Sequence, residues 1–493
     1  MKTYKHIYIS LVSLILIGFA SCEKIEDIEP LFTLDAEIAI VDENSANLVL
    51  IGAYSGFRQK SISSGFPEIF MVPSKLSGLG LSSPFGRPTQ EGSSYDQNNP
   101  DTNGSINLGA YTNFYDVINR ANWLINGVTK LTDDNFTTPG RRDEMLGEAK
   151  ALRALAHFYL LRQWGQFYDS SSAFGITVNT EPSRSSKVSP RSTVSDSYAQ
   201  IIDDLNDAIA MAPDGTTKIF ANKTFAKGLK AKVLLYQGKY AEAATLAKDV
   251  IDNSGGNFSL ATTYDEIFDN SSPALFDSTE VLFGSRGENG AASEGLGMGN
   301  FWGAQYIVVS PSFLPFTNGT INIGGQQISY DGSRAATHFV QFSPAPFLDN
   351  AKYSFAGGEI YEMIYHLRMS EIYLIYAESD ARANNMVTTN SLNALNFVRT
   401  RAGATTTGGN GFETYPASIS LNQFLETVRI EKYIELAGET GEEWFDLVRY
   451  HFVDGFDVSS VKPTATNPDK FILPIPSLSI EAGGNVVAQN PSY

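Results

Sequence analysis

The sequence is poor in cysteine, histidine and positive charge, and each shortage excludes a class of protein. A single cysteine cannot form an intrachain disulfide, and the few scattered histidines show no spacing typical of a zinc site. With 36 Lys and Arg against 54 Asp and Glu, the formal net charge is −18, which repels nucleic-acid phosphates. We therefore expect no metal, no cofactor and no nucleic-acid partner.

Histidine and tryptophan are scattered rather than clustered. The histidines after the N-terminal region are expected to be hydrogen-bonded structural residues; they are His157, His338, His366 and His451. Of the four tryptophans, Trp123, Trp164 and Trp444 lie in helical patterns and are predicted to be core residues.

Long hydrophobic runs are absent except near the N-terminus. The run Ile7 to Phe19 follows Lys2 and Lys5 and is shorter than the about 20 residues that span a bilayer, as in a signal peptide. The end of this segment, Phe19-Ala20-Ser21-Cys22, resembles a bacterial lipobox. That resemblance implies removal of residues 1–21 and lipidation of Cys22, whereas the alternative is an ordinary secretory signal followed by an incidental cysteine.

Catalytic motifs are missing as well. We find no nucleophile elbow, phosphate loop, HExxH motif or EF-hand spacing. Glu431, Glu435 and Arg429 stand beside residues with core character, so we interpret them as buried structural partners rather than an active site. We expect a protein that is not an enzyme, although a glycosidase carboxylate pair separated in sequence stays open as an alternative.

What the sequence does contain is helical periodicity. Apolar residues recur at steps of three, four and seven, and the segment Lys223 to Ile251 has the small residues and the Tyr240 of a tetratricopeptide-like hairpin. A second hairpin starts near Leu367 and stops at Gly403. We predict a mainly α fold, a tetratricopeptide-like stack of helical hairpins with a large irregular insertion of loops and short strands.

The predicted organisation has a leader, a tether and a single domain. The signal peptide covers 1–21, the tether 22–36 and the domain 37–493. Within the domain we expect helical repeats at about 42–252 and 363–450, irregular insertions at about 60–106 and 253–362, and an extended tail at 451–493. Pro474 and Pro476 are expected to prevent a helix in this tail.

Five sequence blocks carry a family resemblance. They are GEAKALRALAHFYLLRQWG from Gly147, LRMSEIYLIYAESDARA from Leu367, ALNFVRTRAG from Ala394, FLETVRIEKYIELAGE with EEWFDLVRY from Phe424, and ILPIPSLSIEAGGNVVAQNPSY from Ile472. In this order, behind a lipoprotein-like leader, they resemble the SusD/RagB family, the surface glycan- or nutrient-binding lipoproteins of Bacteroidetes. The likeness spans nearly the whole mature chain.

The resemblance implies a role at the cell surface. Members of the family are anchored to the outer membrane by lipid and pass oligosaccharide to a TonB-dependent transporter of the SusC type. The acidic residues Glu23, Glu26 and Asp27 are similar to the surface-export tether of such lipoproteins. Alternatives are delivery of peptides or another nutrient, and a helical-repeat scaffold with only protein partners.

Sugars bind where exposed aromatic rings stand beside amides and arginine on rigid loops. Both irregular regions have this mixture, and the resemblance places the ligand site in regions of this kind. The candidate ligand residues are Trp302, Phe301, Tyr306, Tyr95, Phe85, Arg87, Gln97 and Asn98. Trp302 is the leading candidate for a stacking platform because glycines flank it, and the alternative is that it plugs the base of the insertion.

Overall fold

The computed structural model describes residues 39–57, 66–84, 89–185, 189–269, 271–288, 302, 307–332, 334, 338–340, 348–353, 361–406, 408–409 and 411–493. The described chain is mainly helical with a few short strands, as the apolar periodicity predicts. The predicted signal peptide, the tether at 22–36 and Cys22 lie outside the described residues.

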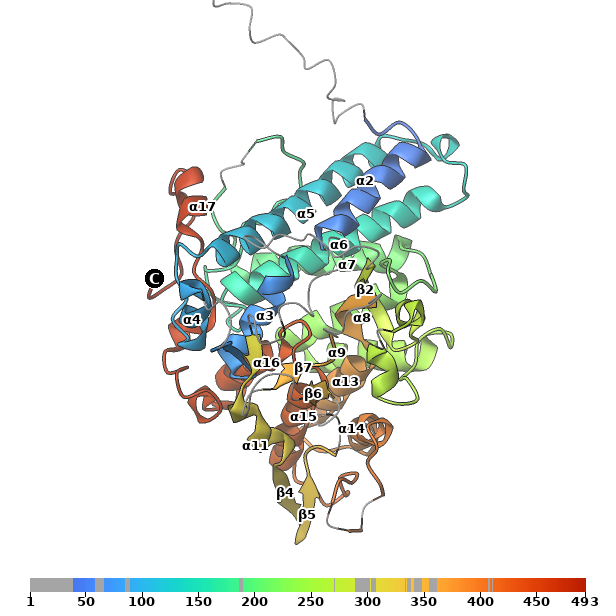
Figure 1. The fold of residues 1–493 in the computed structure, drawn as a ribbon. Helices are drawn as coiled ribbons and strands as arrows, with labels where there is room; N and C mark the ends of the chain where they lie inside the picture. The colour runs from blue at the N-terminus through green and yellow to red at the C-terminus, as the bar shows by residue number, and fades with distance from the viewer. Residues whose placement is uncertain are drawn as a thin grey trace, which may run out of the picture.

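The N-terminal half forms a layer of helices that lie side by side (Figure 1). Its helices are α2 (Glu43–Gly56), α5 (Ser105–Thr129), α6 (Arg141–Trp164) and α7 (Val194–Met211). Asp42 and Thr193 cap α2 and α7 through their side chains. Helix α6 is buried on nearly all sides because it lies between α5 and α7.

The remaining helices continue the stack. They are α8 (Lys223–Tyr236), α9 (Tyr240–Asn253), α13 (Met369–Asn384), α14 (Thr389–Arg401), α15 (Leu421–Glu435) and α16 (Glu442–Asp454). Helix α13 packs on α9 although 115 positions separate the end of α9 from the start of α13 along the chain. At Gly228 of α8, a Cβ atom would lie 2.9 Å from side-chain atoms of Ile372, Leu282 and Leu367. Glycine at this position therefore permits the close approach between the two halves of the stack.

Short strands and short helices fill the regions between the long helices. The strands are β1 (Gly80–Ser82), β2 (Val281–Glu288), β3 (Ile307–Val309), β4 (Thr320–Ile323), β5 (Gln326–Ser329), β6 (Phe339–Val340), β7 (Asp349–Asn350) and β8 (Tyr361–Arg368). They form antiparallel pairs, β1 with β3, β2 with β8, β4 with β5 and β6 with β7. The expectation of short strands within 253–362 is thus confirmed.

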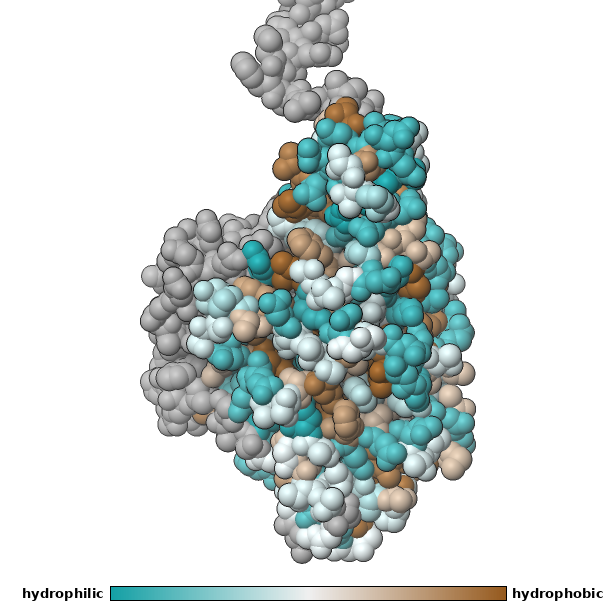
Figure 2. Space-filling view, turned by 90° about the vertical axis from the view of Figure 1, so that its right-hand side faces the viewer, coloured by the Kyte–Doolittle hydropathy of each residue, from teal (hydrophilic) through white to brown (hydrophobic). Residues whose placement is uncertain are grey.

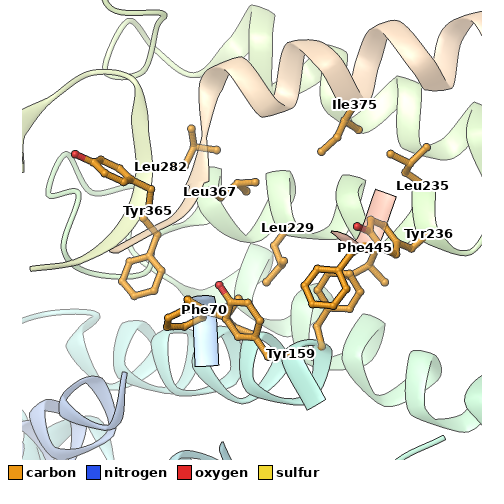
Figure 3. Close-up of a cluster of buried hydrophobic side chains, with 14 of the residues drawn as sticks. Phe70, Tyr159, Leu229, Leu235, Tyr236, Leu282, Tyr365, Leu367, Ile375 and Phe445 are labelled. Carbon is orange, nitrogen blue, oxygen red and sulfur yellow. The ribbon is translucent and has the colours of Figure 1, made fainter. Parts of the chain in front are cut away.

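The core joins side chains from both halves of the chain. Figure 3 shows Phe70 and Tyr159 from the N-terminal half in one buried cluster with Tyr365 and Leu367 from the C-terminal half. The rings of Phe70 and Tyr159 meet edge to face at 5.3 Å, a favoured geometry for aromatic pairs. Phe70 belongs to α3 (Phe66–Ser77), so this helix is anchored in the core.

Two expectations about irregular structure are wrong in part. The region 60–106 contains helices α3 and α4 (Gln90–Asp96) besides β1, and the tail 451–493 contains α17 (Ser477–Ala482). Helix α3 accommodates Pro73 in its interior, and its buried apolar residues compensate for this poor local propensity. Helix α17 starts directly after Pro476, where a proline is compatible with a helix start.

The face shown in Figure 2 is mostly hydrophilic, with hydrophobic side chains scattered among polar ones. Single exposed apolar residues of this kind are normal on protein surfaces. Among the helices that the structure describes, none has both the length and the apolar character that crossing a bilayer requires.

Candidate functional site

Strands β1 and β3 bring together the two regions predicted to bind the ligand. Gly80, Leu81 and Ser82 pair with Val309, Val308 and Ile307. Two hydrogen bonds extend the pairing, from Ser310 N to the Leu79 carbonyl at 2.7 Å and from Ser312 Oγ to the Gly78 carbonyl at 3.0 Å. Residues more than 220 positions apart therefore form one local framework, which we call the strand junction (residues 78–82 and 307–312).

A buried polar network holds α4 against the strand junction. Lys75 pairs with Asp96 at 3.6 Å and donates hydrogen bonds to Ser82 Oγ and to the Gly92 carbonyl. Asp96 also accepts a hydrogen bond from Ser82 N. Burial lowers the pKa of Lys75, and the neighbouring Asp96 opposes that shift. These buried bonds make the end of α4 a rigid element rather than a loop.

Two of the predicted ligand residues serve this framework. Tyr95 is 1% exposed and donates a hydrogen bond to Glu91 Oε1 at 2.7 Å. Asn98 has a left-handed φ of 49°, donates from Nδ2 to the Leu76 carbonyl at 3.0 Å and accepts from Thr464 Oγ1 at 2.7 Å. Their expected exposure on a loop is corrected, because the structure buries both.

Gln97, between them, is exposed at the end of α4. Gln90, at the start of the same helix, and Asn99 are also exposed, and Asn99 Oδ1 accepts a hydrogen bond from Lys470 Nζ. These neutral amides suit a neutral hydroxylated ligand.

Trp302 is buried and is not an exposed platform in this structure. Its side chain is 1% exposed, and its backbone forms a bridge to Ile307 of β3. A Cβ atom at Gly438 would lie 3.1 Å from Trp302 Cζ2, so the indole packs against the backbone between α15 and α16. The burial corrects the expected surface position and favours the alternative that Trp302 plugs the base of the insertion.

Four other candidates, Phe85, Arg87, Phe301 and Tyr306, lie outside the described residues. Their role in ligand binding stays a prediction.

The C-terminal tail contributes to this region, which sequence reasoning missed. Thr464 donates to both Asn98 Oδ1 and the Asp96 carbonyl, and Lys462 is 8% exposed beside Gly78. Nothing in the local pattern of the tail predicts contacts with residues more than 360 positions away.

The buried carboxylates of the C-terminal helices are ion-paired. Arg334 Nη1 lies 2.6 Å from Glu431 Oε1 and 2.8 Å from Glu435 Oε2, and Arg368 and Arg401 also pair with Glu435. These cations keep the pKa of Glu435 well below its usual range despite burial, which raises it. The interpretation of Glu431 and Glu435 as structural partners is confirmed. Arg429 is also buried, with its guanidinium 4.0 Å from the centre of the Phe456 ring.

The histidines are structural, with one exception to the hydrogen-bonding prediction. His366 bonds to Tyr159 and Ser285 at 2.8 Å each, His338 to Asp265 at 3.1 Å and His451 to the Phe456 carbonyl at 2.8 Å. His157 is fully buried, and neither of its ring nitrogens has a hydrogen-bond partner in the described chain. Burial lowers its pKa to about 3, so it is neutral. The described residues hold no group of three acidic, histidine or cysteine side chains arranged for a metal.

The tryptophans predicted to be core residues differ in burial. Trp164 and Trp444 are fully buried, as expected, whereas Trp123 is only partly buried and has the Arg184 guanidinium 5.8 Å from its ring centre.

Comparison with known proteins adds a family context. A family model described as starch-binding and associating with the outer membrane matches residues 87–235, and the model of the SusD family matches residues 312–493. A SusD-like protein of Bacteroides ovatus is 24% identical over 387 residues, which are 69% of this chain and 65% of that protein. The chain spans less than two thirds of the length of the curated relatives it matches.

Solved structures share the fold. A SusD superfamily protein from Bacteroides thetaiotaomicron has a TM-score of 0.74 at 22% identity, covering 92% of this chain and 100% of that chain. A structure described as a laminarin-binding SusD-like protein has a TM-score of 0.68 at 21% identity, covering 92% and 100% of the two chains. The predicted tetratricopeptide-like helical fold is thereby confirmed.

Proposed function

The chain belongs to the SusD/RagB family, and on that premise we propose that it is a lipid-anchored surface protein that binds oligosaccharide. It captures the oligosaccharide at the outer membrane and passes it to a SusC-like TonB-dependent transporter. Its role is binding, and it has no catalytic step of its own.

The strand junction is the observation that carries the proposal. A glycan site built from two distant loop regions requires that these regions meet on a rigid support. The pairing of β1 with β3 and the buried bonds of Lys75 and Asp96 supply such a support. The ligand-contacting residues proposed around it are Phe85, Arg87, Gln97, Phe301 and Tyr306.

The comparisons support a carbohydrate as the ligand. One matching family model is described as starch-binding, and one similar structure is described as laminarin-binding. The neutral groups at Gln90, Gln97 and Asn99 suit sugar hydroxyls, and the proposed aromatic residues would stack on the apolar faces of the sugar rings.

Calorimetric titration of the mature protein with soluble starch and laminarin tests the proposal. We expect saturable binding to at least one neutral glycan, and Phe85→Ala should weaken it roughly three- to tenfold, the effect of losing one stacked ring. Phe397→Ala is the matched control, because Phe397 is 52% exposed on α14 outside the proposed contact set.

Three results would contradict parts of the proposal. Release of reducing ends would indicate a glycoside hydrolase, and binding of peptides instead of glycans would indicate another nutrient. Binding of neither ligand class would favour a protein scaffold.

The partner is tested separately. Affinity purification from membranes in mild detergent should recover a large β-barrel transporter in nearly equal amount. Recovery of this chain alone would contradict the proposed transfer to a transporter.

A further inference from the structure

An open groove lies on α5, away from the strand junction. One wall is the segment 177–185 and the other is α17, which lies beside the N-terminal end of α5 (Figure 1). The volume of the groove is about 500 Å³, within the range of small-molecule sites in proteins. We propose that this groove is a second saccharide-binding site, specific for neutral sugars, an inference that rests on the proposed function.

Side-chain amides of α5 fix the first wall. Asn119 Nδ2 donates to the Ser183 carbonyl at 2.9 Å, and Ser183 N donates back to Asn119 Oδ1 at 2.8 Å. Asn122 Nδ2 donates to the carbonyls of Asn179 and Glu181 at 3.2 and 3.1 Å. The segment is therefore held against α5 at several points.

The tail residues around α17 fix the second wall. Asn490 Nδ2 donates to the carbonyls of Trp164 and Leu473 at 2.9 and 2.7 Å, and Arg191 Nη1 donates to Asn490 Oδ1 at 2.6 Å. On this anchored wall Leu478 is 58% exposed. Leu478 thus presents a large aliphatic side chain to solvent at the edge of the groove. Such a side chain can contact the apolar face of a ligand.

The chemistry of the lining favours a neutral ligand that donates hydrogen bonds. Asn179 Oδ1 is buried and has no hydrogen-bond partner in the described chain. This oxygen can therefore accept a hydrogen bond from a ligand. The described lining includes the carboxylate of Glu181 and that of Asp116, which pairs with Arg120 at 2.6 Å, but neither lysine nor arginine. Sugar hydroxyls would supply donors, whereas a uronic or sulfated sugar would be repelled.

The floor supplies the apolar part of a sugar site. The Tyr111 and Tyr115 rings meet edge to face at 5.0 Å, and Tyr111 also contacts the Trp164 ring at 5.3 Å. Together with Leu478 they give the groove the combination of rings, aliphatic surface and single polar atoms that carbohydrate sites use.

The same substitution at two threonines of α5 tests whether binding depends on the groove. Thr112 lines the groove, and Thr129 lies on the same helix about 25 Å further along, outside it. Both threonines are exposed and donate to the carbonyl four residues earlier. Thr112→Trp fills the groove, Thr129→Trp is the control, and Asn179→Leu removes the free acceptor without adding bulk.

The experiment titrates the full mature chain with maltoheptaose, laminarihexaose and an oligogalacturonate, and follows hydrogen exchange by mass spectrometry. We expect a neutral oligosaccharide to protect peptides covering 108–122, 177–185 and 477–487. Thr112→Trp and Asn179→Leu should remove this protection or weaken the affinity for the oligosaccharide at least tenfold. Thr129→Trp should retain both the protection and the affinity. Protection that persists in Phe85→Ala would show that the groove acts independently of the proposed loop site.

Other outcomes overturn the inference in distinguishable ways. If the wild-type protein binds a neutral oligosaccharide without protection of the groove, the second site is refuted and the proposed function stands. Equal protection by the oligogalacturonate would refute the neutral specificity. If the wild-type protein binds none of the glycans tested, including starch and laminarin, the proposed function itself fails.

Discussion

Replacing Glu443 by glutamine should make the protein more stable at alkaline pH. Glu443 lies in the first turn of α16, is 1% exposed and accepts a hydrogen bond from Ser74 Oγ of α3. Burial raises the pKa of this carboxyl from 4.5 to about 7, because desolvation disfavours the charged form more than the Ser74 hydrogen bond favours it. Since α3 and α16 support the strand junction, this residue affects the framework of the proposed site.

The sign follows from proton binding. Between pH 4.5 and about 7 the folded protein keeps the Glu443 proton while the unfolded chain loses it, so rising pH destabilises the fold across this window. A pKa difference of this size corresponds to about 3 kcal/mol above pH 7. Glutamine is neutral at every pH and can still accept from Ser74. Glu443→Gln should therefore raise the free energy of unfolding by up to about 3 kcal/mol at pH 8 and change it little at pH 4.5.

Chemical denaturation of the wild type and the variant at pH 4.5, 6 and 8 measures this difference. Glu442→Gln is the control at the neighbouring position, because Glu442 pairs with Arg162 and Lys232, which hold its pKa below the usual range. That variant leaves buried cations with fewer partners, so its free energy of unfolding should be about 3–5 kcal/mol lower than that of the wild type at pH 8. A Glu443→Gln variant that is less stable at pH 8, or that keeps the wild-type pH dependence, would refute the reasoning.

Three further changes have defined outcomes. Trp302→Ala should lower the free energy of unfolding by about 3–5 kcal/mol, since it empties a buried site, and a thermal melt would show the loss; an unchanged melting temperature with lost glycan binding would support the platform instead. Asn98→Ala should lower the free energy of unfolding, measured by chemical denaturation, by roughly 2–3 kcal/mol, because it removes two hydrogen bonds and disfavours the positive φ. Asn98→Gly should lower it less, because glycine adopts a positive φ readily. Cys22→Ala should release the protein from the membrane fraction without unfolding it, and retention of the variant in washed membranes would count against lipidation.

Local sequence pattern was sufficient for most of the helices. The hairpin over Lys223 to Ile251 forms as its spacing indicates, and Asp42 and Thr193, residue types that favour helix caps, cap α2 and α7. These signals are reliable because capping and helical amphipathicity depend on residues within a few positions of each other. Helix α3 was missed because Pro73 weakens its local signal and tertiary burial stabilises it.

The candidate site was predictable only as two regions. Composition alone indicated that 60–106 and 253–362 contain residues suited to sugar binding, but it could not separate Gln97, which is exposed, from Tyr95 and Asn98, which are buried. An aromatic or amide side chain has the same local signal whether it supports a framework or contacts a ligand.

The sequence by itself thus determined the helical class, the hairpin over Lys223 to Ile251 and the family blocks, since each depends on residues close together along the chain. Only the tertiary structure decided that β1 meets β3, that Trp302 turns inward against Gly438, and that α17 and α5 enclose a groove. These contacts join positions more than 100 residues apart, and their free energy comes from burial and hydrogen bonds that exist only after the chain has packed.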